Sequence, residues 1–262
     1  MEPALNVAKT GLETQQTRMS IIANNLANVS TTGYKKTQAS FEDLLYQTVQ
    51  QPGASSSQNT ELPTGLLLGT GVRLVSTEKV FTQGAINTSD NPVDVAIQGR
   101  GFIQILTPEG NIAFTRDGSF AIDANGQLVT NEGYLIEPAI TVPDNAQAIR
   151  IGVDGTVSVS TADSPQAQQV GQLTLARFIN PAGLENFGSN LLLETDASGT
   201  PTLANPGLDG LGQLRQGYLE RSNVEVVNEL VSLISAQRAY EVNSRVIRTS
   251  DNMLSTVNQI IR

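Results

Sequence analysis

The sequence predicts an α+β fold in which heptad helices at the two ends of the chain pair as a coiled coil, with a mostly antiparallel β domain between them. Near both termini, seam residues recur at alternating steps of three and four, which places their side chains along one line of a helix. Between residue 72 and about residue 194, short runs of alternating apolar and polar residues are separated by turn residues, a pattern typical of strands.

The amino-terminal helix is expected over residues 4 to 26. Its charged side chains, including Lys9, Glu13 and Arg18, fall outside the seam, so the apolar stripe is confined to one face. The following residues are rich in Asn, Ser, Thr and Gly, which end helices and form turns. The seam consists of Leu5, Ala8, Leu12, Gln15, Met19, Ile22 and Leu26.

The carboxyl-terminal helix is expected over residues 226 to 262. Its seam contains the polar residues Asn243 and Ser250 and is narrow, which favours another helix as its partner over a broad globular surface. One stripe alone would also fit a helix lying on the central domain, but two matched stripes at opposite ends favour pairing. The seam runs through Val226, Leu230, Leu233, Ala236, Tyr240, Asn243, Ile247, Ser250, Leu254, Val257 and Ile261, with one extra three-residue step.

Residues 51 to 71 differ in composition from the amino-terminal helix. Pro, Gly and Ser dominate the first part, which is a linker composition and also fits a disordered loop. The apolar run Leu66, Leu67 and Leu68 argues that part of the segment is covered by protein, so we interpret it as a clip. Residues 41 to 49, just before it, fit either a short helix or a strand.

The central region contains several strand patterns, at residues 93–97, 101–106, 120–122 and 127–129. The clearest hairpin joins residues 149–153 to 156–159 through Asp154 and Gly155, and a two-residue Asp-Gly loop predicts a type I′ turn. Strand patterns at 172–179 and 190–194 follow, and a return loop over 195–212 leads to the last helix. We therefore expect four parts: an amino-terminal helix and extended segment (1–50), a clip (51–71), a central β domain (72–212) and a carboxyl-terminal coiled-coil helix (213–262).

Composition narrows the function classes. The 262-residue chain has no Cys and no His, which excludes disulfides, thiolate chemistry and the commonest general base and metal ligand. Its formal net charge is −9, with the acidic excess between residues 51 and 214, so a phosphate-backbone partner is not expected. The amino end lacks the basic start and apolar core of a secretory signal. The chain is thus expected to be cytoplasmic or exported without a cleavable signal.

No active site is expected. Five aspartates invite a carboxylate-pair or calcium interpretation, but they fall at turns and strand starts, where Asp caps the backbone, and their spacing matches no calcium-binding loop. A glycosidase-like pair remains an unsupported alternative. We predict no catalytic, cofactor or metal site and no small-molecule substrate; the aspartates in question are Asp90, Asp94, Asp117, Asp123 and Asp154.

Residues 21–36 near the amino end, and residues 222–230, 237–244 and 251–254 near the carboxyl end, carry long motifs. These motifs resemble those of the bacterial flagellar rod and hook axial proteins. The central stretches 94–102 and 114–120 are similar to the β domain shared by rod and hook members, and stretches 8–12, 41–47 and 69–73 resemble the distal rod members. The resemblance covers essentially the whole chain. Its signature residues are Asn24, Asn25, Leu26, Ala27, Asn28, Thr32, Gly33, Tyr34 and Lys35 near the amino end, and Gln237, Arg238, Ala239 and Tyr240 near the carboxyl end.

The resemblance implies a non-enzymatic subunit that polymerises helically into the distal rod of the flagellar basal body. It also implies export through the flagellar type III apparatus and contacts with copies of itself, other rod proteins, the hook protein and the surrounding rings. A hook or proximal rod subunit is the nearest alternative. From a different class, a secreted β-rich adhesin or carbohydrate-active protein with helical tails is the competitor.

Overall fold

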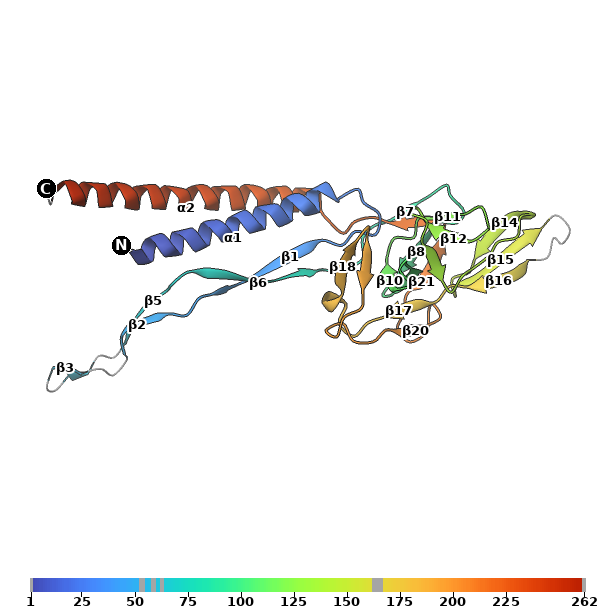
Figure 1. Cartoon of the computed structure of the whole chain (residues 1–262), viewed down its shortest axis with the longest axis horizontal. Coiled ribbons are helices and arrows are strands. Elements are labelled where there is room, and N and C mark those ends of the chain that lie inside the picture. The colour runs from blue at the N-terminus through green and yellow to red at the C-terminus, as the bar shows by residue number, and fades with distance from the viewer. Residues whose placement is uncertain (1, 52–54, 58–59, 62–63, 162–166, 261–262) are drawn as a thin grey trace. The chain divides into compact units, whose positions relative to one another are not determined.

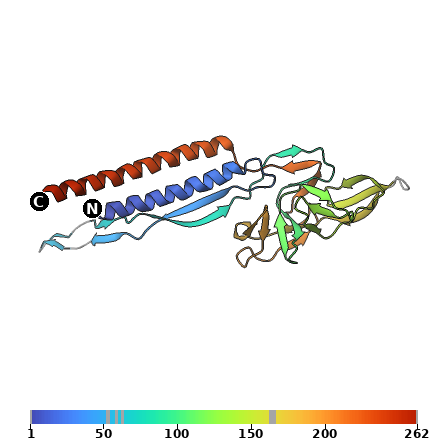
Figure 2. The ribbon, with the colours of Figure 1, turned by 45° about the horizontal axis from the view of Figure 1, so that its top comes forward.

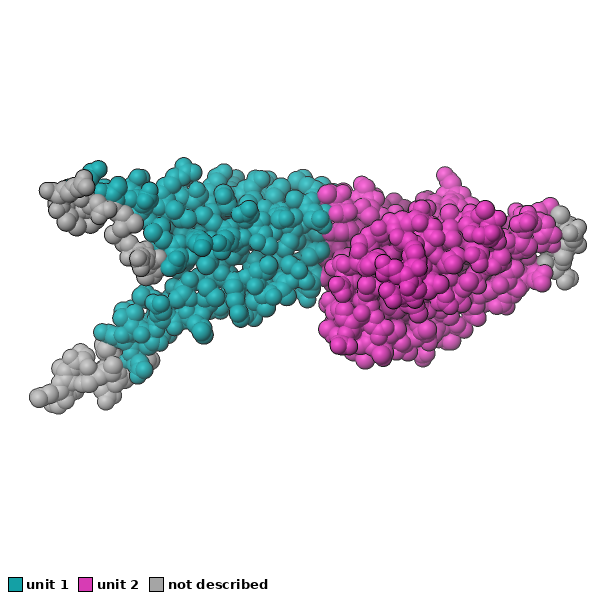
Figure 3. Space-filling model, in the orientation of Figure 1, with its two compact units in different colours: residues 1–26, 37–78, 225–262 teal, residues 27–36, 79–224 magenta. Residues whose placement is uncertain are grey.

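The computed structural model describes residues 2–51, 55–57, 60–61, 64–161 and 167–260. The chain divides into two compact units, coloured separately in Figure 3. Unit 1 comprises residues 1–26, 37–78 and 225–262, and unit 2 comprises residues 27–36 and 79–224. The chain therefore passes between the units four times. The α+β class predicted from the sequence is confirmed, with a helix at either end of a mostly antiparallel β region.

Unit 1 contains the two helices, α1 (Glu2–Ala27) and α2 (Val226–Ile260). Figures 1 and 2 show them side by side and running in opposite directions. Gly11 of α1 lies directly against Asn243 of α2, because a Cβ added at Gly11 would be 2.8 Å from the Asn243 Nδ2. The absence of a side chain at Gly11 thus makes room for the seam residue Asn243.

The rest of unit 1 is a two-stranded β arm. In residues 41–49, for which the sequence left helix and strand open, residues 41–43 and 47–49 are strand and residues 44–46 form a bend between them. Three nested pairs build the arm: β1 (Thr37–Asp43) with β6 (Val72–Lys79), β2 (Gln47–Gln50) with β5 (Leu66–Leu68), and β3 (Ser55–Ser57) with β4 (Thr60–Glu61). Gly71 is in the left-handed region at φ 122°, and its Cα approaches Thr10 of α1 so closely that a Cβ would lie 2.2 Å from the Thr10 Oγ1.

Unit 2 is built on a nine-stranded sheet in the order β11-β12-β13-β9-β10-β19-β18, with β17 and β20 attached through β9. A three-stranded sheet, β14-β15-β16, lies between β13 and β17 in the chain. The strands of the large sheet are β9 (Phe102–Leu106), β10 (Ile112–Thr115), β11 (Phe120–Ile122), β12 (Leu128–Thr130), β13 (Leu135–Glu137), β17 (Leu175–Arg177), β18 (Glu185–Gly188), β19 (Leu191–Leu193) and β20 (Thr202–Ala204). The small sheet consists of β14 (Ala146–Ile151), β15 (Thr156–Thr161) and β16 (Gln168–Gln172), and the short 3-10 helix η1 (Pro181–Gly183) precedes β18.

Two two-stranded ribbons complete unit 2: β8 (Val95–Gln98) pairs with β21 (Gln213–Gln216), and β7 (Ile86–Thr88) pairs with β22 (Tyr218–Glu220). Both β21 and β22 fall in the part 213–262, ahead of the segment 226–262 that was expected to be the terminal helix. The helix itself begins at Val226, as predicted. The short alternating run Gln213–Gln216 buries Leu214 completely, and this burial places it in the β core.

The core of unit 2 consists of a larger, mainly aliphatic cluster and a smaller cluster built around three phenylalanine rings. The larger cluster includes Ile97, Ile103, Ile105 and Leu173, all fully buried. The smaller cluster contains the rings of Phe102, Phe114 and Phe178, packed edge to face. Because β9 supplies Ile103 and Ile105 to one cluster and Phe102 to the other, its alternating side chains connect both sides of the sheet.

One predicted turn differs from expectation. Gly152 N donates to Thr156 O at 2.8 Å, so the β14–β15 loop contains three residues, not two. Asp154 accepts hydrogen bonds from the backbone N–H and hydroxyl of Thr156, and Gly155 adopts φ 86°. The type I′ prediction was therefore wrong: it requires positive φ at both loop residues, and Asp154 instead closes the loop through its side chain.

Candidate assembly surfaces and the buried ion cluster

The amino-terminal seam lies on the covered face of α1. Ala8 and Ile22 are buried, and every other seam position is half-buried while the residues between them are mainly exposed; the half-buried positions are Leu5, Leu12, Gln15, Met19 and Leu26. The three-and-four spacing therefore follows the face that the chain itself covers.

The carboxyl-terminal seam is covered over its middle part only. Ala236 is buried and Leu233, Asn243, Ile247 and Ser250 are half-buried. Val226, Leu230 and Tyr240 are exposed. A helix of 3.6 residues per turn drifts against a seven-residue repeat, which carries Val226 and Leu230 to the edge of the covered face. Leu254 and Val257 lie on α2, but their side chains are outside the described part of the chain, as is the whole of Ile261.

A second apolar stripe follows the side of α2 away from the covered seam. Its residues are exposed and recur mainly at steps of three, four or seven, as in a second helix-packing seam. Val231, for example, is 61% exposed. The stripe contains Val227, Val231, Ile234, Val242, Val246 and Met253. A monomer leaves such a stripe in water, so it is a candidate contact surface.

The clip residues Leu66, Leu67 and Leu68 form β5 of the arm and are exposed in the single chain. They pair with β2 through the backbone, with Leu68 opposite Gln47 and Leu66 opposite Gln50. Their exposed fractions are 49%, 53% and 43%, so the described part of the chain covers each side chain only in part. Full burial would need a neighbouring copy or another protein.

The amino-terminal signature has a structural role where α1 ends. Asn25 is buried, and its side chain both donates to Thr37 O and accepts from Thr37 N, each at 2.9 Å. This pair of hydrogen bonds ties the helix to Thr37, the first residue of β1. Asn28 accepts the Thr31 hydroxyl, and Thr32 O accepts the Asn190 amide. The remaining members Asn24 and Ala27 are exposed.

Gly33, Tyr34 and Lys35 belong to unit 2, where they enter the β region. Gly33 adopts φ 69°, and a Cβ there would lie 2.7 Å from the Asp117 backbone nitrogen, so glycine is required twice over. Its N–H donates to Glu220 O at 2.8 Å. Tyr34 is buried, with the Lys79 ammonium 5.7 Å from its ring centroid. Burial lowers the pKa of Lys79.

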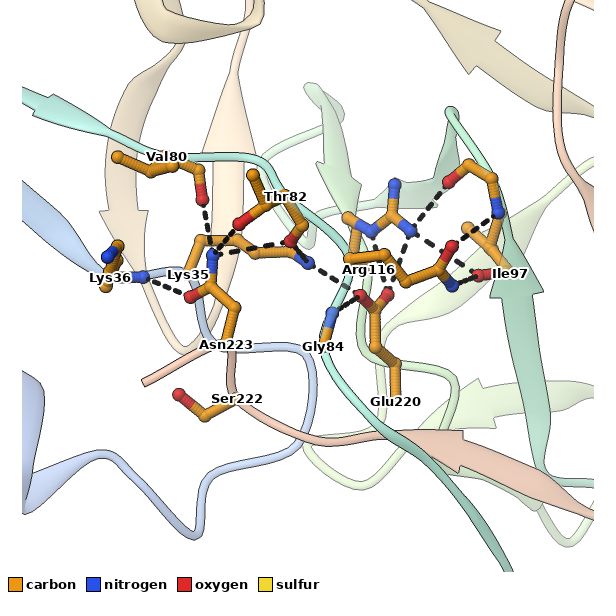
Figure 4. A network of polar contacts seen from close by, with 12 residues as sticks. Lys35, Lys36, Val80, Thr82, Gly84, Ile97, Arg116, Glu220, Ser222 and Asn223 are labelled. Atoms are coloured by element: carbon orange, nitrogen blue, oxygen red, sulfur yellow. Dashed lines mark hydrogen bonds and ion pairs between the residues drawn. The ribbon is translucent and has the colours of Figure 1, made fainter. Parts of the chain in front are cut away.

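Lys35 is the first member of a buried ion cluster (Figure 4). Its Nζ lies 2.6 Å from Glu220 Oε1 and donates to Thr82 O at 2.7 Å. Arg116 approaches the other oxygen of the same carboxylate, with Nε 2.9 Å from Glu220 Oε2. The Glu220 side chain is 0% exposed, and the side chains of Lys35 and Arg116 are almost as deeply buried.

The hydrogen-bonding capacity of the cluster is well used. Gly84 N–H also donates to Glu220 Oε1, and the Arg116 guanidinium donates to the carbonyls of Gly101 and Gly99. Burial, followed by the charge of Arg116, lowers the pKa of Lys35, while Glu220 acts in the opposite direction. A buried charge is tolerated only when it is paired and hydrogen-bonded. The cluster thus couples three chain segments distant in sequence.

Asn223 makes a second polar clamp beside the cluster (Figure 4). Its Oδ1 accepts from Lys36 N at 2.8 Å, and its Nδ2 donates to Val80 O at 2.7 Å and to the Thr82 hydroxyl at 2.9 Å. Val80 N also donates to Lys36 O at 2.9 Å. The segments around residues 36, 80 and 223 are therefore fixed together within unit 2.

The sequence did not single out Glu220 as a site residue. The sequence feature that could have indicated Glu220 is an acidic residue at the end of the strand pattern Tyr218–Glu220. Its partner is the signature lysine Lys35, which is buried. Lys35 was identified only through the family motif. The carboxyl-terminal signature residues Gln237, Arg238 and Tyr240 are exposed on α2, with Ala239 half-buried.

The aspartates behave as turn residues. Asp94 accepts from Ser89 and Asn91, and Asp123 accepts from the backbone of Asn125 and Gln127. Asp117 accepts from the N–H and hydroxyl of Ser119 and lines a polar cavity of about 350 Å³ with Glu132 and Tyr134. Burial raises the pKa of Asp117, against the hydrogen bonds of Ser119.

In the described part of the chain, neither helix combines the length and apolar character needed to cross a membrane. Three family models match. Residues 5–35 match the model "Flagella basal body rod protein", residues 96–159 match "Flagellar hook protein FlgE/F/G D1 domain", and residues 215–260 match "Flagellar basal body rod FlgEFG protein C-terminal". The matched segments contain both terminal signatures and much of the β region.

Curated relatives match over the full length. A "Flagellar basal-body rod protein FlgG" of Buchnera aphidicola subsp. Schizaphis graminum is 55% identical over 99% of this chain and 100% of the relative. The protein of the same name from Caulobacter vibrioides is 48% identical over 98% of each chain. That of Bacillus subtilis is 36% identical over 97% of each.

Proposed function

Since the chain belongs to the FlgG family of flagellar basal-body rod proteins and is a structural subunit of the distal rod, we propose that it polymerises through its terminal helices into a rigid, hollow shaft that transmits torque from motor to hook. The polymer would meet other rod proteins at one end, the hook protein at the other, and ring proteins around its circumference. Subunits would reach it through the flagellar type III export apparatus, without a cleavable signal.

The second apolar stripe of α2 is the observation that carries this proposal. α2 uses one seam within the chain and presents another, including Val231 and Ile234, to solvent. Covering one such aliphatic side chain stabilises an interface by roughly 1.5–3 kcal/mol, so several repeated contacts can offset the loss of freedom on association. A polymer provides a neighbouring helix at every subunit, whereas a monomer provides none.

The near-neutral ends of the chain support the same arrangement. Along α1 and α2, basic and acidic residues are close to balanced, while the acidic excess lies in the central region. Helices of this kind can pack on copies of themselves without strong repulsion. The acidic central region would keep the growing structure soluble.

The test is polymerisation of the purified chain with Val231→Asp. A carboxylate at an interface helix would be desolvated without a partner, so the variant should remain monomeric in sedimentation while its circular dichroism matches the parent. Val231→Thr, which keeps the branched shape without a charge, is the matched control and should still form tubes by electron microscopy. Tubes from the Val231→Asp chain indistinguishable from those of the parent would exclude this stripe from the assembly contact.

A further inference from the structure

In the described part of the arm, an apolar side chain is almost completely exposed. Leu45, in the bend between β1 and β2, is 91% exposed, and its neighbour Tyr46 is also exposed. Two hydrogen bonds fix the bend: Leu44 N donates to Gly71 O at 2.9 Å, and the Thr70 hydroxyl donates to Leu45 O at 2.7 Å. Leu45 is thus held outward by an ordered segment.

Acidic side chains accompany Leu45. Glu42 and Asp43 are exposed at the end of β1, and Glu42 forms an exposed ion pair with Arg73 at 3.3 Å. Asp43 carries the charge nearest to Leu45 in the sequence. The bend therefore combines an apolar projection with a negative charge, and we call residues 42–46 the acidic knob.

Unit 2 contains a cavity that is lined by aromatic rings and by arginines, so its charge is opposite to that of the acidic knob. It has a volume of about 570 Å³, and Phe81, Phe102 and Phe178 contribute to its lining. The Phe102 ring packs edge to face on Phe81 at 5.3 Å and on Phe178 at 5.9 Å, which preserves an ordered aromatic wall. Phe81, Phe102, Phe178, Arg100, Arg177 and Ile179 define what we call the aromatic cavity.

The rim of the aromatic cavity is basic. Arg100 and Arg177 are exposed, and Arg177 Nη1 donates to Asp209 O at 2.7 Å, which orients its guanidinium. Ile179, also on the rim, is 88% exposed. Arg116 lines the cavity too, but its charge is matched by Glu220 in the buried cluster. An otherwise acidic chain therefore carries a basic, aromatic pocket.

We propose that the acidic knob of one copy inserts Leu45 into the aromatic cavity of a second copy, with Asp43 facing the Arg100 and Arg177 rim. This inference rests on the self-assembly proposed above. A helical homopolymer needs heterologous contacts, in which two different patches of the same chain fit one another. The knob and the cavity are complementary both in charge and in apolar character, and a cavity of several hundred Å³ accommodates a leucine and part of a tyrosine.

The chain contains no cysteine, which makes a cross-linking test specific. Two single variants, Leu45→Cys and Ile179→Cys, are mixed, polymerised and treated with a short bis-maleimide, which adds one thiol at each end without an oxidant. Because each chain carries a single thiol, every 45-to-179 product joins different copies. Its yield should exceed that of a Leu203→Cys and Ile179→Cys control mixture by about tenfold, since adjacent thiols react at a high effective concentration.

A further pair examines the alternative knob on β18, where Phe187 is exposed beside Glu185. If Phe187→Cys cross-links to Ile179→Cys while the 45-to-179 yield does not exceed that of its control mixture, then Phe187, and not Leu45, enters the aromatic cavity. Polymers that cross-link at neither pair would overturn it and leave self-assembly standing. A parent chain that forms no polymer would remove the self-assembly on which it rests, and the inference with it.

Charge exchange provides an independent readout. Asp43→Lys should raise the critical concentration for polymerisation by about tenfold, because like charges would then meet at the rim. Adding Arg100→Glu to the same chain should restore most of the loss. Polymerisation of Asp43→Lys at the parental concentration would show that the carboxylate does not face the arginine rim.

Discussion

Glu220 Oε1 lies 2.6 Å from Lys35 Nζ, although 185 residues separate the two in the chain, and both side chains are almost fully buried. Arg116 holds the other carboxylate oxygen. The pairing joins the segment that leaves the amino-terminal helix to the segment that leads into the carboxyl-terminal one. The flagellar signature lysine is therefore a structural anchor of unit 2.

Lys35→Met should lower the free energy of unfolding of unit 2 by about 3–5 kcal/mol, the range for breaking a buried ion pair from one side. The matched control is Lys9→Met, because Lys9 pairs with Glu13 at 3.8 Å and both side chains are largely exposed. Losing this exposed pair should lower the free energy of unfolding by only about 0–1 kcal/mol. Urea unfolding followed by circular dichroism measures both. Equal, small losses for the two variants would mean that Arg116 alone satisfies Glu220.

The cluster also determines which residues are needed to isolate unit 2. Lys36 O accepts from Val80 N, so the chain ends at 36 and 79 lie close enough to be joined by a short glycine linker in place of the arm. We predict that residues 27–36, linked to 79–224, fold cooperatively. Residues 79–224 alone lack Lys35 and should be less stable by about 3–5 kcal/mol. Equal denaturation midpoints and slopes for the two chains would contradict this requirement.

The sequence predicts local features well and the boundaries between the units poorly. The two terminal helices and the strand Phe102–Leu106 were predictable because each is set by a short periodic pattern. Glu220 and Asn223 were missed because their roles depend on partners more than a hundred residues away, which no local pattern encodes. The turn at Asp154 was predicted wrongly because of a local contact: the Asp154 side chain accepts from Thr156 and closes a three-residue loop, whereas the Asp-Gly dipeptide alone favours a two-residue turn.

Asp117→Asn should make the stability of unit 2 less dependent on pH. Burial raises the folded-state pKa of Asp117 above its ordinary value of 3.8, so the parent loses stability as pH rises from that value through the raised pKa. Asparagine keeps an oxygen for the Ser119 N–H and hydroxyl but carries no charge.

The difference in unfolding free energy, variant minus parent, should therefore increase through that acidic window and then level off. Thermal unfolding at a series of pH values measures it. Asp123→Asn is the control with the opposite sign, because hydrogen bonds, led by that from Gln127 N–H, lower the pKa of the exposed Asp123. A flat difference for Asp117→Asn would show that its carboxyl group has the same pKa in the folded and unfolded chain.

The outer part of the arm offers a test of stiffness separate from assembly. The Thr70 hydroxyl donates to Leu45 O at 2.7 Å, so the chain can be closed there by a short glycine turn when residues 47–68 are removed. That deletion keeps Leu44, Gly71 and their backbone bond, and with them the β1–β6 base of the arm. It removes β2 and β5 together with the three exposed clip leucines.

We predict that the deleted chain still polymerises, because both helices and unit 2 are intact, but that its tubes bend more. An apolar segment left exposed by its own chain is expected to cover itself on a neighbouring copy, and each such bridge restrains one subunit against the next. Electron microscopy would show the effect as a shorter persistence length. Replacing Leu66, Leu67 and Leu68 by Ser at full length is the matched control, and it should bend the tubes too if the leucines carry the contact. Tubes as straight as the parent's from the deleted chain would remove the clip from the stiffening role, whereas a failure to polymerise would show that the segment is required for assembly itself.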